Sequence, residues 1–152
     1  MFCVKMMYTD EATELEIVKG TTSTSEAEVQ EVMTQEEILT MRSMVRAVPI
    51  ADDVAKYAIR LVRETRGEST SSEAVRKYGS YGASPRASQS LVIGAKAKAL
   101  LAGRFHVDFE DVKAMALPVL RHRLVLNFRA KADGIDSDKI ITDILAKTPF
   151  EG

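Results

Sequence analysis

Apolar side chains recur every three or four residues along most of the chain, a spacing that predicts amphipathic helices. Ser84 precedes Pro85, which suits the first helical position, and Gly103 is a typical residue after a last turn. We therefore predict a helix over 85–102. The expected buried stripe consists largely of small residues: Leu91, Ala95, Ala99 and Ala102, with Ser88 and Val92 beside it.

Two more helices are expected before this one. Thr34 and Glu37 form a capping box ahead of an apolar repeat, which predicts a helix over 34–47. Asp52 begins a second helix, which is expected to run up to Gly67. Its predicted buried face consists of Val54, Ala58, Leu61, Val62 and Thr65.

The remaining part of the chain predicts two helices and one long connection. Residues 66–83 are rich in serine and glycine and read as a connection, with a weak helical turn over 73–78. Asp108 begins a helix that Pro118 should kink, and Asp136 begins the last helix. The expected buried faces are Val112, Met115, Val119, His122 and Leu126 for the former, and Ile140, Ile141, Ile144 and Leu145 for the latter, over 137–147.

The N-terminal part follows a different pattern. Residues 1–8 (MFCVKMMY) form a short apolar run that predicts a buried strand. Asp10 then begins a short helix that should end at Gly20, and residues 21–33 predict a linker. The expected fold is therefore an all-α bundle of about five helices over 34–149, preceded by a strand, a short helix and a linker over 1–33.

Composition narrows the class of protein. Hydrophobic residues make up 45% of the 152 residues and charged residues 28%, as in globular proteins. With 21 basic and 22 acidic residues the net charge is −1, which argues against nucleic acid as a partner. One cysteine and two histidines exclude a disulfide framework and a zinc motif, so a reducing cytoplasm is expected. No apolar run is long enough for membrane insertion.

Arg86 is the first candidate for a functional residue. It lies in the first turn of the helix predicted over 85–102, where the helix dipole is positive and a cation is disfavoured by about 0.3–1 kcal/mol. An anion bound at this helix end would remove the penalty. The alternative is an arginine whose side chain simply reaches solvent.

Other candidates have stronger structural explanations. Asp108 follows an apolar run and precedes Glu110, as in some metal sites, but it is better placed as a helix cap. His122 lies on an apolar helix face, which is typical of a core or interface histidine. Tyr78 and Tyr81 could stack on bases, but no basic stripe accompanies them. The chain contains neither a phosphate-binding P-loop nor a complete catalytic constellation, and we predict no metal ligands.

Taken together, six segments resemble the C-terminal part of a MoxR-type AAA+ ATPase. They are ELEI at 14–17, VRAVP at 45–49, YAIRLVRETR at 57–66, GASPRA at 82–87, VDFEDV at 107–112 and PVLRHRL at 118–124. The resemblance implies that residues 34–149 are the helical lid of such an enzyme. Arg86 would be its sensor 2 arginine, which contacts a nucleotide phosphate, with Ser84 and Ala87 beside it in the motif.

The resemblance also implies what surrounds the lid. Residues 1–33 would be the end of a missing α/β core domain that carries the P-loop and the Walker B acids and binds ATP and Mg²⁺. The lid would cover ATP and contact neighbouring subunits in a hexameric ring that remodels or assembles partners, some with a von Willebrand factor A domain. Alone, the chain would not hydrolyse ATP. The alternative is a free-standing helical adaptor that binds a protein helix in a groove.

Overall fold

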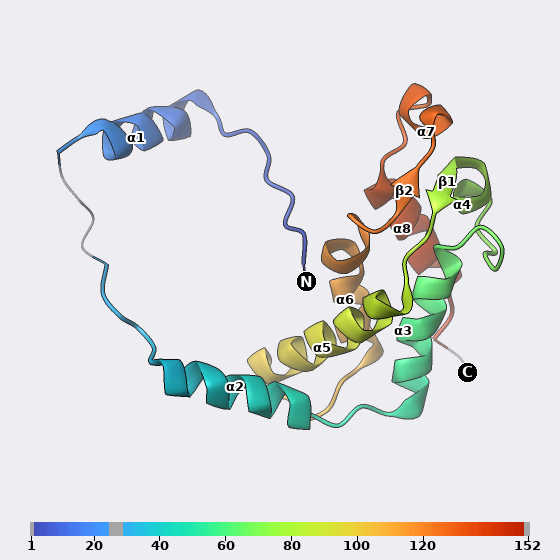
Figure 1. Ribbon diagram of the computed structural model, residues 1–152, viewed down its shortest axis with the longest axis horizontal. Coiled ribbons are helices and arrows are strands. Elements are labelled where there is room, and N and C mark those ends of the chain that lie inside the picture. The colour runs from blue at the N-terminus through green and yellow to red at the C-terminus, as the bar shows by residue number, and fades with distance from the viewer. Residues whose placement is uncertain (1, 25–28, 151–152) are drawn as a thin grey trace.

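The helix with the small-residue stripe lies at the centre of the fold. In the computed structural model, which describes residues 2–24 and 29–150, this helix is α5 (Pro85–Leu101). It packs against α2 (Gln35–Ala47), α3 (Asp52–Glu64) and α6 (Phe109–Leu120) (Figure 1). Its buried residues are Ala87, Leu91, Gly94, Ala95 and Ala99. The stripe is confirmed except at its end.

The end of α5 differs from the prediction by one residue. Ala102 is the C-cap and is exposed, because the last turn extends beyond the helices that cover the rest of the stripe. Gly103 follows with φ +72°, a left-handed conformation that glycine adopts without steric penalty. The predicted helix stop at this glycine is confirmed.

The other elements complete an all-α fold with one small sheet. They are α1 (Glu11–Thr22), α4 (Glu73–Tyr78), α7 (Phe128–Ala132), α8 (Ser137–Lys147), β1 (Gly79–Tyr81) and β2 (Val125–Leu126). The all-α class is confirmed, and the five predicted helices are α2, α3, α5, α6 and α8; the described part adds two short ones, α4 of 6 residues, where a helical turn was predicted, and α7 of 5 residues. The two strands pair antiparallel, with Gly79 opposite Leu126 and Tyr81 opposite Val125.

The helix that begins after Asp108 is shorter than predicted. It ends at Leu120, two residues after Pro118, which cannot donate a backbone hydrogen bond to Ala114. His122 is therefore beyond the helix and exposed, and Leu126 belongs to β2. The predicted helical face is confirmed only for its earlier members, of which Val112 and Val119 are buried.

The predicted N-terminal strand is not formed. Phe2–Asp10 has no regular secondary structure, because no other strand lies alongside it to accept or donate backbone hydrogen bonds. The segment is attached at its start, where Cys3 N donates to Pro118 O at 2.7 Å and Lys5 pairs with Asp136 at 3.5 Å. Met1 lies outside the described residues.

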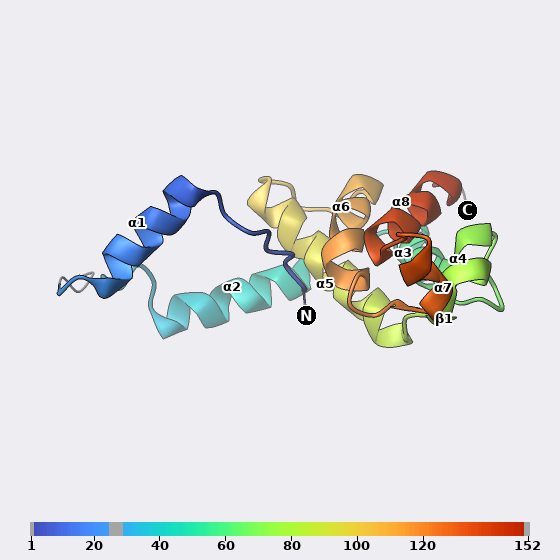
Figure 2. The same cartoon turned by 90° about the horizontal axis from the view of Figure 1, so that it is seen from above.

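The first helix stands apart from the helical body in both ribbon views (Figures 1 and 2). α1 contains no buried residue and continues past Gly20 to Thr22, so the predicted stop is wrong. The hydroxyl of Thr22 donates to Val18 O at 2.6 Å, which extends the last turn. Of the predicted linker, residues 25–28 lie outside the described residues.

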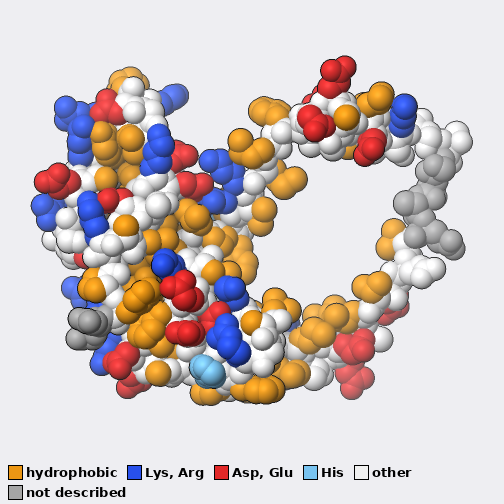
Figure 3. All heavy atoms as spheres, turned by 180° about the vertical axis from the view of Figure 1, so that it is seen from behind, with side chains coloured by type: hydrophobic (Ala, Val, Ile, Leu, Met, Phe, Trp, Pro, Cys, Tyr) orange, Lys and Arg blue, Asp and Glu red, His pale blue; other side chains and the backbone are white. Residues whose placement is uncertain are grey.

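Exposed apolar side chains are concentrated at this end of the molecule. Figure 3 shows hydrophobic side chains along α2 and along the N-terminal segment. They include Val4, Met6, Met7 and Tyr8 before α1 and Ile38, Leu39, Met41 and Met44 on α2. Among the described residues no helix combines the length and the apolar character that a membrane span requires.

One buried ion pair fixes the start of α6. Arg104 Nη1 and Nη2 donate to the two carboxylate oxygens of Asp111 at 2.7 and 2.6 Å. The Asp111 side chain is only 2% exposed and also accepts from Asp108 N at 3.0 Å. The hydrogen bond from Arg104, and after it that from Asp108 N, outweigh burial and lower the pKa of Asp111.

We therefore predict a pH-dependent contribution of Asp111 to stability. The pKa of Asp111 is lower in the folded protein than in the unfolded chain, so its charged form stabilises the fold. This stabilisation is fully present above the unfolded pKa of about 3.9 and is lost as the pH falls through the folded pKa. Asp111→Asn should lower the free energy of unfolding by about 1.5–3 kcal/mol at pH 7, and this deficit should shrink at pH 3. Urea titrations of both proteins at both pH values measure the difference in the free energy of unfolding.

The matched control is Asp53→Asn. Asp53 pairs with Lys56 at 3.4 Å, but both side chains are well exposed. Its loss should therefore change stability by less than about 0.5 kcal/mol at either pH. An equal deficit for Asp111→Asn at pH 7 and pH 3 would contradict the pH dependence.

Candidate functional site

Arg86 lies on the surface at the beginning of α5. It follows Pro85, which occupies the first helical position, and precedes Ala87, whose side chain is fully buried. One step along a helix turns the side chain by about 100°, so Arg86 faces solvent when Ala87 faces the core. Its guanidinium has no hydrogen bond or ion pair with any residue that the structure describes.

Ser84 and Ala87 flank Arg86 in different ways. Ser84 has the extended conformation of an N-cap, with φ −79° and ψ 169°, but its side chain makes no capping hydrogen bond within the described residues. The backbone N–H of Ala87 donates to Ser84 O at 2.9 Å, so this N–H is only weakly available to a ligand. Their contact with a nucleotide stays a prediction.

The Arg86 side chain borders an open hollow of about 500 Å³. The lining residues are Phe2, Arg86, Gln89, Ser90, Ile93, Gly94 and Arg123. Five of them follow one face of α5 at helical spacing, and Arg123 comes from the turn after α6. None of the described lining residues is acidic. The hollow therefore carries two positive charges without a negative charge in its wall.

A serine connects the two arginines. Ser90 Oγ donates to Arg86 O at 2.9 Å and accepts from Arg123 Nη2 at 3.3 Å. Arg123 Nη1 donates to Val119 O at 2.9 Å, which anchors the side chain at the end of α6. Partial desolvation and then the positive charge of Arg123 lower the pKa of the neighbouring His122, as expected in a positive field.

Phe2 reaches the same hollow because α5 has a glycine there. A Cβ atom added to Gly94 would lie 2.7 Å from Phe2 Cζ and 3.1 Å from Met115 Cγ, both closer than ordinary contact. The absence of a side chain at Gly94 thus admits the Phe2 ring against α5 and lets α6 approach. The N-terminal segment forms one wall of the arginine hollow in this way.

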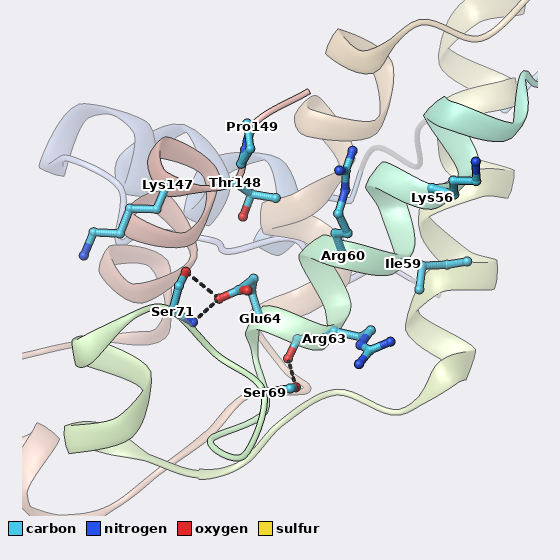
Figure 4. Close-up of a pocket in the computed structure, with 10 residues that line it drawn as sticks. All are labelled: Lys56, Ile59, Arg60, Arg63, Glu64, Ser69, Ser71, Lys147, Thr148 and Pro149. Carbon is cyan, nitrogen blue, oxygen red and sulfur yellow. Dashed lines mark hydrogen bonds between the residues drawn. The ribbon is translucent and has the colours of Figure 1, made fainter. Parts of the chain in front are cut away.

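A second basic hollow lies between α3, α8 and the connection after α3 (Figure 4). It has a volume of about 530 Å³ and includes Lys56, Arg63 and Lys147. Glu64 is also present and accepts from Ser71 N at 2.7 Å. Figure 4 also labels Arg60, so four cationic side chains line this hollow, and Lys147 pairs with Asp143 at 2.8 Å. Unlike the hollow at Arg86, this one has an acidic residue, Glu64, in its lining.

The chemistry available at the arginine hollow is anion binding. Its described lining has guanidinium and amide donors, but no paired nucleophile and base. No group of three or more His, Cys, Asp or Glu side chains that could hold a metal ion occurs in the described part of the chain. A phosphate group fits the donor set, whereas a metal ion does not.

Asp108 and Tyr78, which were also considered from the sequence, have structural roles. Asp108 caps α6 by accepting from Phe109 N at 2.6 Å, as predicted. The Tyr78 hydroxyl donates to Asp133 at 2.9 Å, which fixes it near α7. Sequence reasoning missed Arg123 as a site residue, because only the packing of α6 against α5 brings it beside Arg86.

The helical body matches a known class of domain. The family described as the AAA lid domain matches residues 71–144, which include α5, α6 and most of α8. The crystal structure of a candidate ATPase from Cytophaga hutchinsonii superposes with a TM-score of 0.82 at 34% identity, over 98% of this chain and 46% of that one.

Two curated relatives are similar to this chain. The chaperone MoxR1 of Mycobacterium tuberculosis is 40% identical over 90 residues, which are 59% of this chain and 24% of that protein. The uncharacterized protein YeaC of Bacillus subtilis is 28% identical over 154 residues, 99% of this chain and 46% of that protein. The chain thus spans less than half of each relative. Together with the lid match, these findings show that it carries the lid domain of a MoxR-family AAA+ ATPase.

The close approach at Gly94 generates a prediction about the N-terminal segment. Gly94→Ala gains about 0.8–1 kcal/mol of helix propensity, which offsets part of the cost of crowding Met115 of α6, whose Cγ would lie 3.1 Å from the new Cβ. The new methyl group should displace Phe2 and so weaken the bond between Cys3 N and Pro118 O. Amide exchange of Cys3 should therefore be faster in the variant.

Gly20→Ala is the matched control, because a Cβ at Gly20 meets nothing within 4 Å. This variant should leave the exchange of Cys3 unchanged. Unaltered protection of Cys3 in Gly94→Ala would mean that Phe2 does not depend on the glycine.

Proposed function

We propose that this chain is the lid that covers ATP in a MoxR-like ATPase, and that Arg86 contacts a phosphate of the nucleotide. The observation that carries the proposal is the exposed guanidinium of Arg86 in the first turn of α5, beside a hollow whose described walls contain no acid. The positive helix end and the unpaired cation favour the same ligand, an anion. ATP supplies it, and Ser84 and Ala87 lie next to Arg86 in the motif.

The remainder of the machinery is proposed to lie outside this chain. The P-loop, the Walker B acids and the Mg²⁺ ligands would belong to an α/β core domain of the intact cytoplasmic protein, which would hydrolyse ATP. The apolar surface of α2 and of the segment before α1 would contact that core and neighbouring subunits in a hexameric ring. The ring would remodel or assemble partner proteins, including ones with a von Willebrand factor A domain.

One observation favours the alternative of a free-standing adaptor. Met41, Met44 and Val45 of α2 and Ala97, Leu100 and Leu101 of α5 line an apolar groove of about 300 Å³. Such a groove could receive an apolar helix face of another protein. The DNA upstream discriminates the two proposals, since an in-frame P-loop there supports the ATPase and its absence supports the adaptor.

Replacing Arg86 in the complete ATPase tests the first proposal. Arg86→Ala should reduce ATP affinity or turnover by about 10- to 100-fold, the equivalent of a lost hydrogen bond to a charged group. Arg86→Lys should restore only part of the lost affinity or turnover. A lysine ammonium keeps the charge but lacks the planar pair of donors with which a guanidinium engages two oxygens. The helix should remain folded, since alanine is the best helix former.

Arg42→Ala is the control for that series, because Arg42 is exposed on α2 and does not line the hollow. Nucleotide affinity and steady-state turnover, measured on assemblies of verified size, distinguish a raised KM from a lowered kcat. Wild-type values for Arg86→Ala would identify Arg86 as a merely solvated side chain.

A separate prediction concerns the chain by itself. It should not release phosphate from ATP, because it lacks the P-loop lysine and Walker B acids that position phosphates and Mg²⁺. Turnover is measured with Mg²⁺-ATP against a blank without protein. Activity that survives repurification and follows the protein through gel filtration would refute the prediction.

A further inference from the structure

Arg123 lines the arginine hollow together with Arg86. It lies in the turn after α6, whereas Arg86 is in the first turn of α5. The two side chains belong to segments that only the packing of α5 on α6 brings together. Arg123 is partly buried and Arg86 is exposed, so the inner arginine is the better fixed of the two.

The donors of Arg123 are only partly used. An arginine has five N–H donors, and the two bonds of Arg123 go to neutral oxygens, those of Val119 O and Ser90 Oγ. It has no carboxylate partner among the described residues. The remaining donors have no partner among the described residues, and Arg123 lines the hollow.

Two neighbouring arginines show how this fold treats a structural guanidinium. Arg104 is held by both carboxylate oxygens of Asp111, and Arg121 by both oxygens of Asp138 at 3.0 and 3.1 Å. Each of these side chains is neutralised by its own acid. Arg123 is also partly buried but has no acid, which distinguishes it from the structural pairs.

An unneutralised pair of cations on one hollow is electrostatically unfavourable until an anion enters. Gln89 adds a neutral amide donor to the lining, whereas the single Ser90 hydroxyl hydrogen is already donated to Arg86 O. We propose that Arg123 is a second phosphate-binding residue, and that Arg86 and Arg123 together bind two linked phosphate groups of a nucleotide rather than one. This inference rests on the proposed function and names a residue that the sensor 2 motif does not contain.

The test uses the full chain and inorganic pyrophosphate, with orthophosphate as the single-phosphate probe. Binding is followed by NMR of backbone amides and arginine Nε–Hε groups at fixed ionic strength, since salt screens such contacts. Pyrophosphate should bind at least about tenfold more tightly than orthophosphate, because it engages both guanidinium groups. The Nε–Hε resonance of Arg123 should move with the titration, which a purely structural arginine would not do.

Charge-removing variants assign the contacts. Arg86→Gln and Arg123→Gln should each weaken pyrophosphate binding by about tenfold or more and abolish the preference over orthophosphate. Arg129→Gln removes the same charge from an exposed position on α7 and should change the affinity by less than about twofold. If Arg123→Gln disturbs the fold, Arg123→Lys keeps the charge and should bind with intermediate affinity.

The outcomes separate this inference from the proposed function. Weakened binding in Arg86→Gln with wild-type binding in Arg123→Gln overturns the inference and leaves the proposed role of Arg86 standing. The reverse pattern overturns the shared site and also removes Arg86 as the phosphate contact. Failure of the wild-type chain to bind pyrophosphate at millimolar concentration overturns the inference, while the role of Arg86 is then decided in the complete ATPase.

Discussion

The close approach of α5 and α6 is the constraint on which the rest of the structure depends. Gly94 leaves room for Met115 of α6, and Ala95 and Ala99 are fully buried on the same helix. A larger side chain at these positions would move the two helices apart, since protein interiors have no spare volume. The turn after α6 would then move with it. The position of Arg123 relative to Arg86 thus follows from small residues in the core.

The same packing divides the arginines of the domain into two classes. Arg104 and Arg121 connect segments of the fold and are each neutralised by a carboxylate. Arg86 and Arg123 share a hollow without an acid among its described lining residues. A structural ion pair needs no ligand, whereas two unneutralised cations in one hollow favour the binding of an anion. This contrast supports a phosphate site more directly than the first-turn position of Arg86 alone.

The N-terminal segment illustrates how an apolar sequence behaves without a partner. The run from Phe2 to Tyr8 has the composition of a buried strand, but it remains irregular and largely exposed. Only its beginning is fixed, by the bond from Cys3 N to Pro118 O and the packing of Phe2 on Gly94. A strand needs a neighbouring strand for its backbone groups, and the sequence of one segment cannot supply it. An α/β core domain, as proposed, would provide that neighbour.

The sequence by itself determined the long helices and the class of protein. The capping box at Thr34, the proline and glycine around α5 and the acid caps of α6 and α8 are local signals, and each acts within a few residues. The motif around Arg86 was also readable, because it is contiguous. Only the tertiary structure decided where α6 ends, that β1 pairs with β2, and that Arg123 lies beside Arg86. These features depend on contacts between residues distant in the sequence, which local periodicity and capping do not encode.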